Sequence, residues 1–265
     1  MFNIPMNSKA AIDLNSLSSS SPAPVQPQQA FNQQPATPPQ QSFGQPAFNQ
    51  QPSTPAQQNF SQPQATPAAP RPSGSGVILK KGQKTSLSKI NPALNNIRVG
   101  LGWDVGSNTN YDLDSEIFLL GANEKVIGDD WFVFYGQLTS PDGAVVHHGD
   151  NKTGIGEGDD EIIDINLSQL NPQIEKIVFV VTINEAKENG YNFGQIKNAY
   201  IRIIDNSNGK ELVRFDLSEY YKEVVSMVIG ELYLKGGEWR FNPVGMGTGD
   251  DLEGLCIRYG VNVAG

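Results

Sequence analysis

The residues best suited to chemistry in this sequence lie in one acidic, glycine-laced stretch, GDNKTGIGEGDDE at 149–161. Its carboxylates belong to Asp150, Glu157, Asp159, Asp160 and Glu161. Glycine and aspartate are both poor strand formers, so we expect a loop whose glycines let the backbone wrap tightly. Crowded carboxylates repel one another unless a cation lies among them. An oxygen-only ligand set on a flexible loop favours Ca²⁺, which takes roughly six to eight oxygens, over the strictly octahedral Mg²⁺.

A second acidic stretch, WDVGSNTNYDLD at 103–114, lies upstream. Asp112 and Asp114 are two residues apart, so on an extended chain they project to the same face. Asp104 directly follows the apolar run IRVGLGW. A single charge run is usually a solvated loop, but two such runs together favour a metal site. The second stretch then either completes the first site or forms another.

Two other metal-binding patterns do not fit this region. If Asp150 is taken as the first position of an EF-hand loop, Glu161 falls at the required last position, but Ile155 replaces the obligatory glycine and no flanking helices are apparent. His147 and His148 are adjacent, so on a strand they point to opposite faces, and no cysteine is near them in sequence. We therefore expect neither an EF-hand nor a zinc site.

The elements that must position these residues are predicted to be strands. From residue 77 onward, apolar residues alternate with polar ones, as Ile163, Ile165 and Leu167 do with Asp164 and Asn166, and the continuous apolar run IVFVVTI at 177–183 is typical of a central strand buried on both faces. Turn signals separate the runs at SPDG (140–143), NG (208–209) and GG (236–237). The pattern predicts an all-β fold, an antiparallel β-sandwich.

One short C-terminal helix is also predicted. Asp250 and Glu253 form a capping-box pattern, and Gly260 is expected to end the helix. The apolar face would hold Leu252, Leu255, Cys256 and Tyr259. The thiol on this face is expected to be a packed core group rather than a reactive one.

The composition divides the chain at about residue 76. Residues 1–76 hold 14 of the 18 prolines and repeat AFNQQPATP as AFNQQPSTP, which predicts a disordered Gln/Pro-rich tail and linker ending in SGSG. The tail is expected to act as a solvated spacer or to mediate self-association and protein binding through its spaced phenylalanines. Residues 77–265 form the predicted folded domain.

Charge and cysteine content restrict the function further. Before Arg71 the only charged residues are Lys9 and Asp13, so the net charge of −9 falls entirely on residues 71–265, which disfavours nucleic acid as a partner. No apolar run is long enough to span a membrane. A single cysteine cannot form an internal disulfide, and no signal peptide is apparent, so we expect a cytoplasmic protein.

Several segments, in order and spacing, resemble the TerD family of tellurium-resistance and general stress proteins, which has a branch described as cyclic-AMP-binding in slime moulds. They are LGWD (101–104), YDLDSEIFLL (111–120), SPDGAVVHHGDNKTGIGEGDDE (140–161), KIVFVVTI (176–183), NFGQI (192–196), GELY (230–233) and LCIRYGV (255–261). The resemblance covers residues 77–265 and implies a β-sandwich that binds Ca²⁺ through acidic loops. The implied ligands are Asp104, Asp112, Asp114, Asp150, Asn151, Glu157, Asp159, Asp160 and Glu161, with Glu185 after the VVTI strand. Ile155 stands where the family often has an acid.

The expected function is therefore a non-catalytic, calcium-dependent binding or scaffolding module of the stress-response type. The alternative is a cyclic-nucleotide-binding protein, in which a bound Ca²⁺ bridges to the phosphate. An enzyme is disfavoured, because a lone thiol offers no dithiol pair for reduction and the carboxylates crowd one loop instead of flanking a cleft.

Overall fold

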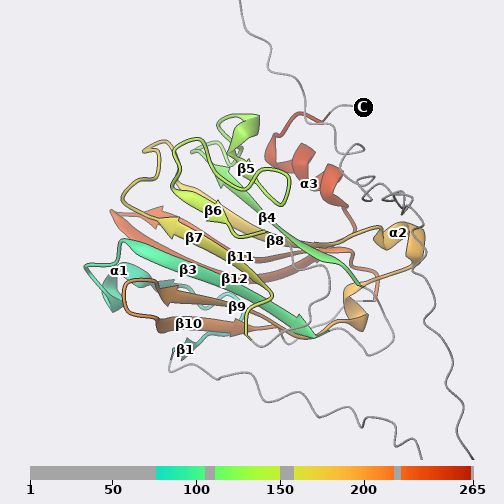
Figure 1. Ribbon diagram of the computed structural model, residues 1–265, viewed down its shortest axis with the longest axis horizontal. Helices are drawn as coiled ribbons and strands as arrows, with labels where there is room; N and C mark the ends of the chain where they lie inside the picture. Colours follow the sequence, from blue (N-terminus) through green and yellow to red (C-terminus); the bar gives the residue numbers. More distant parts are fainter. Residues whose placement is uncertain (1–75, 105–110, 150–157, 218–221, 264–265) are drawn as a thin grey trace, which may run out of the picture. The chain divides into compact units, whose positions relative to one another are not determined.

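Two six-stranded sheets make up the domain in the computed structural model, which describes residues 76–104, 111–149, 158–217 and 222–263 (Figure 1). The first sheet runs in the order β1 (Val77–Ile78), β10 (Lys210–Asp216), β9 (Lys197–Asp205), β3 (Asn96–Asp104), β7 (Glu161–Asn166) and β6 (Val145–His147). The second sheet runs in the order β2 (Thr85–Ser86), β12 (Glu238–Thr248), β11 (Ser226–Lys235), β8 (Lys176–Ile183), β4 (Leu113–Leu120) and β5 (Phe132–Val133). All pairings are antiparallel except that of β1 with β10.

This arrangement confirms the predicted all-β sandwich. The run IVFVVTI lies in β8, which is flanked by β4 and β11, and seven of the eight residues of β8 are buried. β7 alternates buried and half-buried residues along its whole length, as its sequence pattern predicted. The predicted tail and the boundary before residue 77 fall on residues 1–75, which lie outside the described residues.

The predicted turns also have the expected geometry. Gly236 and Gly237 join β11 to β12 with φ angles of 61° and 75°, the left-handed pair that a tight hairpin requires. Gly209 (φ 73°) closes the turn between β9 and β10, and its N–H donates to the carbonyl of Asp205 at 2.8 Å. These turns set the register of the strands that carry the candidate site.

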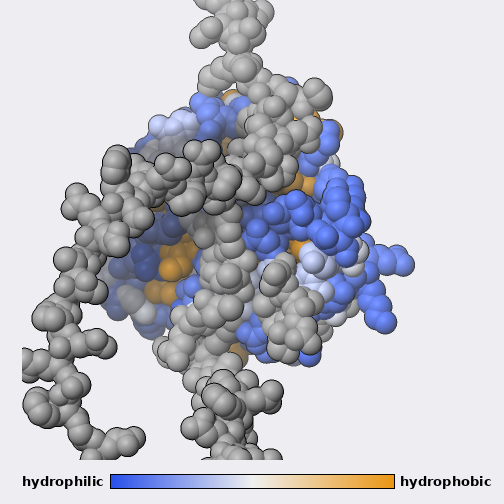
Figure 2. Space-filling model, turned by 45° about the vertical axis from the view of Figure 1, so that its right-hand side comes forward, coloured by the Kyte–Doolittle hydropathy of each residue, from blue (hydrophilic) through white to orange (hydrophobic). Residues whose placement is uncertain are grey.

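Helices are few and short in the described residues. They are α1 (Leu87–Ile90), α2 (Ala186–Asn189) and α3 (Leu252–Tyr259), with 3₁₀ turns at η1 (Asp129–Trp131) and η2 (Phe193–Gln195). None of these helices is long and apolar enough to cross a membrane. In the exposed areas of the face seen in Figure 2, hydrophilic residues predominate and the apolar patches are small.

α3 confirms the predicted C-terminal helix but starts differently. Its N-cap is Asp251, whose side chain accepts a hydrogen bond from the N–H of Gly254, whereas the sequence pattern had placed the cap at Asp250. The Asp250 carboxylate pairs instead with Arg258. Leu255 and Cys256 are fully buried and Gly260 ends the helix, as predicted.

α3 packs on the outer face of the second sheet. The ring of Tyr259 lies 4.6 Å from that of Phe118 on β4, and Phe118 stacks on Phe132 of β5 at the same separation. All eight residues of β4 are buried, because its other face lies in the core between the sheets. Side chains at the start of β4 are therefore removed from solvent on both faces, polar ones included.

Candidate functional site: the acid-rich end of the sandwich

Candidate ligands from both sheets gather at one end of the sandwich, the end toward which β3 points in Figure 1. Antiparallel pairing places the end of β3 beside the start of β7, and the start of β4 beside the end of β8. The described candidates here are Asp104, Asp112, Asp114, Asp159, Asp160, Glu161 and Glu185. We call this region the acid-rich end. Asp150, Asn151 and Glu157 lie outside the described residues.

Asp160 is anchored to the end of β3 by backbone contacts. Its N–H donates to the carbonyl of Leu101, and its Oδ2 accepts from the N–H of Trp103, both at 2.7 Å. Only 8% of the residue is exposed. These bonds fix the backbone that leads from the acidic stretch into β7.

Glu161 crosses from the first sheet to the second. It is the first residue of β7 and not part of a loop as its sequence context suggested, because its backbone pairs with Leu101 on β3. Its Oε2 accepts from the N–H of Ser115 on β4 at 2.9 Å, and only 1% of the residue is exposed. Its Oε1 is buried and has no hydrogen-bond partner among the described residues. A buried, unpartnered carboxylate oxygen is costly, and a cation would offset that cost.

His147 lies beside this carboxylate in a defined tautomer. Its Nδ1 accepts from the N–H of Gly149 at 3.0 Å, so in the neutral ring the proton is on Nε2. That nitrogen lies 2.9 Å from the Ser115 Oγ and 3.4 Å from the Glu161 Oε2. His147 is buried and His148 is exposed and bonded to Asp164, which confirms that the two rings point to opposite sides.

Asp159 is engaged by an arginine. Its two oxygens accept from the Nε and Nη2 of Arg202 on β9, at 2.8 and 2.9 Å, and its Oδ1 also accepts from the Tyr200 hydroxyl at 2.9 Å. A metal ion at Asp159 would have to compete with this guanidinium. Sequence reasoning gave no role to Arg202, because its contact with Asp159 arises only when β9 packs beside β3.

Glu116 is a further acid that the sequence reasoning passed over. It is 0% exposed, its Oε1 accepts from the Thr182 hydroxyl at 2.7 Å, and its Oε2 is buried with no hydrogen-bond partner. Burial first, and then the charge of Asp114, raise the pKa of Glu116 well above the ordinary value. The spacing of two from Asp112 to Asp114 to Glu116 was the signal available in the sequence.

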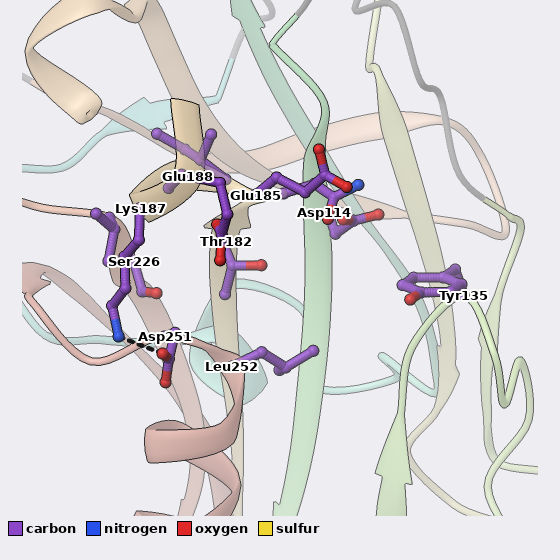
Figure 3. Close-up of a pocket in the computed structure, with 13 residues that line it drawn as sticks. Asp114, Tyr135, Thr182, Glu185, Lys187, Glu188, Ser226, Asp251 and Leu252 are labelled. Carbon is purple, nitrogen blue, oxygen red and sulfur yellow. Dashed lines mark hydrogen bonds and ion pairs between the residues drawn. The ribbon is translucent and has the colours of Figure 1, made fainter. Parts of the chain in front are cut away.

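Glu185 and Asp114 line one small pocket of about 150 Å³ beside α2 and the start of α3 (Figure 3). Glu185 adopts a left-handed backbone (φ 49°, ψ 32°), which is uncommon for a residue with a Cβ. Lys187 from α2 pairs across the pocket with Asp251, the cap of α3. Glu185, at the start of the single-turn helix α2, is thus held at the acid-rich end because the Lys187–Asp251 pair connects α2 to α3.

The ligand set is not complete within the described residues. Among residues 76–104, 111–149, 158–217 and 222–263, no three histidine, cysteine, aspartate or glutamate side chains are placed to hold a metal ion together. Asn198 donates to the Asp104 Oδ2, and Asn184 donates to the Asp112 Oδ2 at 3.3 Å. The acid-rich end is therefore a convergence of carboxylates and not a closed metal centre.

Every arginine in the described residues is paired with a carboxylate. The pairs are Arg98–Asp164, Arg202–Asp159, Arg214–Asp216, Arg240–Glu238 and Arg258–Asp250. Arg202 also contacts Glu211, with its Nη1 at 3.2 Å from the Oε2. An incoming phosphate would have to displace an existing partner at each of these guanidinium groups.

Comparisons with known proteins agree with this architecture. Residues 76–259 match the model of the TerD domain. The chain is 46% identical over 190 residues to the tellurium resistance protein TerD of Serratia marcescens, and 44% identical over 190 residues to general stress protein 16U of Bacillus subtilis (strain 168). Each alignment covers 71% of this chain, and 99% and 98% of the respective relative.

A solved structure shows the same fold. The crystal structure of SAV2460, a protein described as of unknown function, superposes with a TM-score of 0.50 at 22% identity over 60% of this chain and 93% of that one. The family model spans most of the chain, and the relatives match along nearly their whole length. The protein described here belongs to the TerD family of tellurium-resistance and stress proteins.

Proposed function

We propose that the acid-rich end binds Ca²⁺ and that the domain acts as a non-catalytic, calcium-dependent binding or scaffolding module in a cytoplasmic stress response. The observation that carries this proposal is Glu161, whose buried Oε1 has no hydrogen-bond partner in the part of the chain that the structure describes. The neighbouring His147 lies with its Nε2 3.4 Å from the other oxygen, Oε2, so this contact leaves Oε1 unsatisfied. A divalent cation would supply the missing positive charge.

The residues proposed to hold the ion are acids from both sheets and from the acidic stretch. They are Asp104, Asp112, Asp114, Asp160, Glu161 and Glu185, with Asp150, Asn151 and Glu157 expected from the sequence. All offer oxygen ligands, which Ca²⁺ prefers. The ion would screen the repulsion among these groups and so favour the folded state. Binding and folding should therefore be linked.

The arrangement of three buried polar residues on facing strands argues against catalysis. Ser115, His147 and Glu161 are the residue types of a nucleophile, a base and an orienting acid. Here the protonated Nε2 faces both the serine and the acid, so the ring has no lone pair directed at the serine hydroxyl. Each of the three residues is at most 2% exposed, which leaves no access for a substrate.

The cyclic-nucleotide alternative is less well supported. A phosphate site needs available cationic donors or a helix N-terminus that is rich in free N–H groups. All five arginines of the described residues already pair with carboxylates. We therefore favour the calcium proposal over the nucleotide one.

The test is a calorimetric titration of the full chain with Ca²⁺, then with Mg²⁺ and with cyclic AMP, combined with thermal melts. The melting temperature should rise with Ca²⁺, because a ligand at about a hundredfold excess over its Kd stabilises the folded state by about 2.7 kcal/mol. Mg²⁺ should do less, because it dehydrates reluctantly. Identical melts in Ca²⁺ and in chelator would refute the proposal.

Paired variants locate the site. Glu161→Gln and Asp160→Asn should each weaken Ca²⁺ binding. Glu124→Gln removes the same charge from the turn beyond the far end of β4, where Glu124 pairs with Lys176. It should leave Ca²⁺ affinity unchanged, and an equal loss in this control would mean that only net charge matters.

A further inference from the structure

The outer face of the first sheet carries an ion pair of unusually favourable geometry. The Nε and Nη2 of Arg202 donate to the two oxygens of Asp159 at 2.8 and 2.9 Å, and the side chains are only 16% and 4% exposed. Two parallel charge-assisted bonds of this kind fix orientation as well as distance. The pair joins the middle of β9 to the residue two positions before β7.

Two glycines of β3 leave the space in which this ion pair is held. A Cβ at Gly100 would lie 2.1 Å from the Asp159 Oδ2, so the carboxylate occupies the space where a side chain would stand. A Cβ at Gly102 would lie 2.3 Å from the ring of Tyr200, whose hydroxyl bonds to both Asp159 and the carbonyl of Gly158. Residues 158–159 therefore pack against β3 where Gly100 and Gly102 have no side chains.

The arginine is itself held in place from the other side. The Nη1 of Arg202 donates to the Glu211 Oε2 on β10 at 3.2 Å. The guanidinium of Arg214 stacks over the Tyr200 ring with its Cζ 3.7 Å from the centroid. Arg202 and Tyr200 are therefore oriented by their own neighbours, as supporting groups around a precise site must be.

The next two residues are acids of the acid-rich end. Asp160 and Glu161 directly follow Asp159, and their carboxylates are directed by the N–H groups of Trp103 and Ser115. We propose that Arg202 is a positioning residue for calcium binding: by seating Asp159 on Gly100, it fixes where Asp160 and Glu161 present their oxygens. This inference deepens the proposed function and rests on it. It assigns Asp159 to the support of the site and not to the ligand set.

Electrostatics makes the inference sharply testable, because the two possible effects have opposite signs. A positive charge near a cation site repels the ion, so removing Arg202 should strengthen Ca²⁺ binding if charge were its only influence. Loss of an outer support typically weakens metal affinity about 10–100-fold. A decrease in affinity on removal of a cation is therefore the signature of positioning.

The experiment is calorimetric Ca²⁺ titration of full-length Arg202→Met, Gly100→Ala and Arg202→Lys, each compared with wild type. Arg202→Met should weaken binding at least about tenfold. Gly100→Ala should do the same with no change in charge, because its Cβ expels the Asp159 carboxylate from its seat. Arg202→Lys keeps the charge but loses the two-pronged contact, and it should fall between wild type and Arg202→Met.

Arg98→Met is the matched control. Arg98 makes an equivalent two-bond pair with Asp164 on the same face of the sheet, at 2.8 Å for both bonds, but Asp164 lies inside β7 and away from the acidic stretch. Losing it should lower the melting temperature in chelator but leave Ca²⁺ affinity unchanged or slightly higher. Melts in chelator show which variants fold, and the remaining variants decide the question.

Three outcomes are informative. Weakened binding in Arg202→Met and Gly100→Ala, with affinity retained in Arg98→Met, supports the inference. Binding in folded Arg202→Met or Gly100→Ala that equals or exceeds that of wild type overturns it and leaves the proposed function standing. No Ca²⁺ binding by wild type overturns the proposed function, and this inference with it.

Discussion

Glu116 should make the stability of the domain fall as pH rises, and Glu116→Gln should abolish that fall. The carboxyl is fully buried on the outer face of the second sheet, and among the described residues only the Thr182 hydroxyl is bonded to it. Burial, followed by the charge of Asp114, raises its pKa well above the ordinary value of 4.5. The folded protein therefore holds a proton that the unfolded chain releases.

The sign and size follow from proton linkage. The stability contributed by this group is complete below the unfolded value of 4.5 and is lost as pH rises toward the folded pKa. Each pH unit in that window changes the free energy of unfolding by about 1.4 kcal/mol. Glutamine needs no proton, so the stability of Glu116→Gln relative to wild type should increase as pH rises above the unfolded value.

The assay is urea unfolding of both proteins across a pH series from about 4.5 to 7, in chelator so that metal binding does not contribute. The difference between the two curves should be small at the acidic end and widen steadily. Glu124→Gln, at an exposed position paired with Lys176, should stay parallel to wild type. Parallel curves for Glu116→Gln as well would show that Glu116 titrates alike in the folded and unfolded chains, and would refute the reasoning.

Two further predictions concern other buried groups. Burial raises the pKa of the Cys256 thiol to about 12, so a thiol reagent at about pH 8 should label it slowly until the domain unfolds. Cys256→Ser should lower the free energy of unfolding in urea by about 1–3 kcal/mol. Rapid labelling of the native protein would contradict the packed position of this thiol. Asp205 accepts bonds from Ser207, Asn208 and Asn91, and these bonds, led by that from Ser207, hold its pKa below the ordinary value. The stability that Asp205 contributes is therefore present above the unfolded value of 3.8 and is lost as pH falls through the folded pKa. Asp205→Ala should lower the free energy of unfolding by about 2 kcal/mol near neutral pH. An unchanged free energy of unfolding would show that the hairpin between β9 and β10 closes without these bonds.

Much of the scaffold could be predicted from the sequence because it depends on local pattern. Alternation identified β7, the apolar run identified β8, and glycine pairs identified the hairpin between β11 and β12. Each of these signals lies within a few adjacent residues. The single-turn helices α1 and α2 were not predicted, since four residues are too few for a periodic pattern.

The site was harder to predict because its contacts join distant parts of the chain. The carboxylates were recognisable by type, but the partner of Asp159 lies 43 residues away on β9. In the sequence IRVGLGW was recognisable only as an apolar run, whereas Gly100 leaves the space that the Asp159 carboxylate occupies. The cap of α3 was misplaced by one residue because Asp250 and Asp251 are chemically equivalent, and their tertiary contacts, with Arg258 and Lys187 respectively, tell them apart.

The short strands at the rims of the two sheets have a consequence for the behaviour of the protein at high concentration. β1, β2 and β5 have two residues each and β6 has three, and these four close both edges of both sheets. Each rim strand presents only two or three residues at the edge, and each pairs only part of the long strand beside it, as β2 does with Arg240 and Phe241 of β12. Such edges guard against edge-to-edge aggregation and strand swapping.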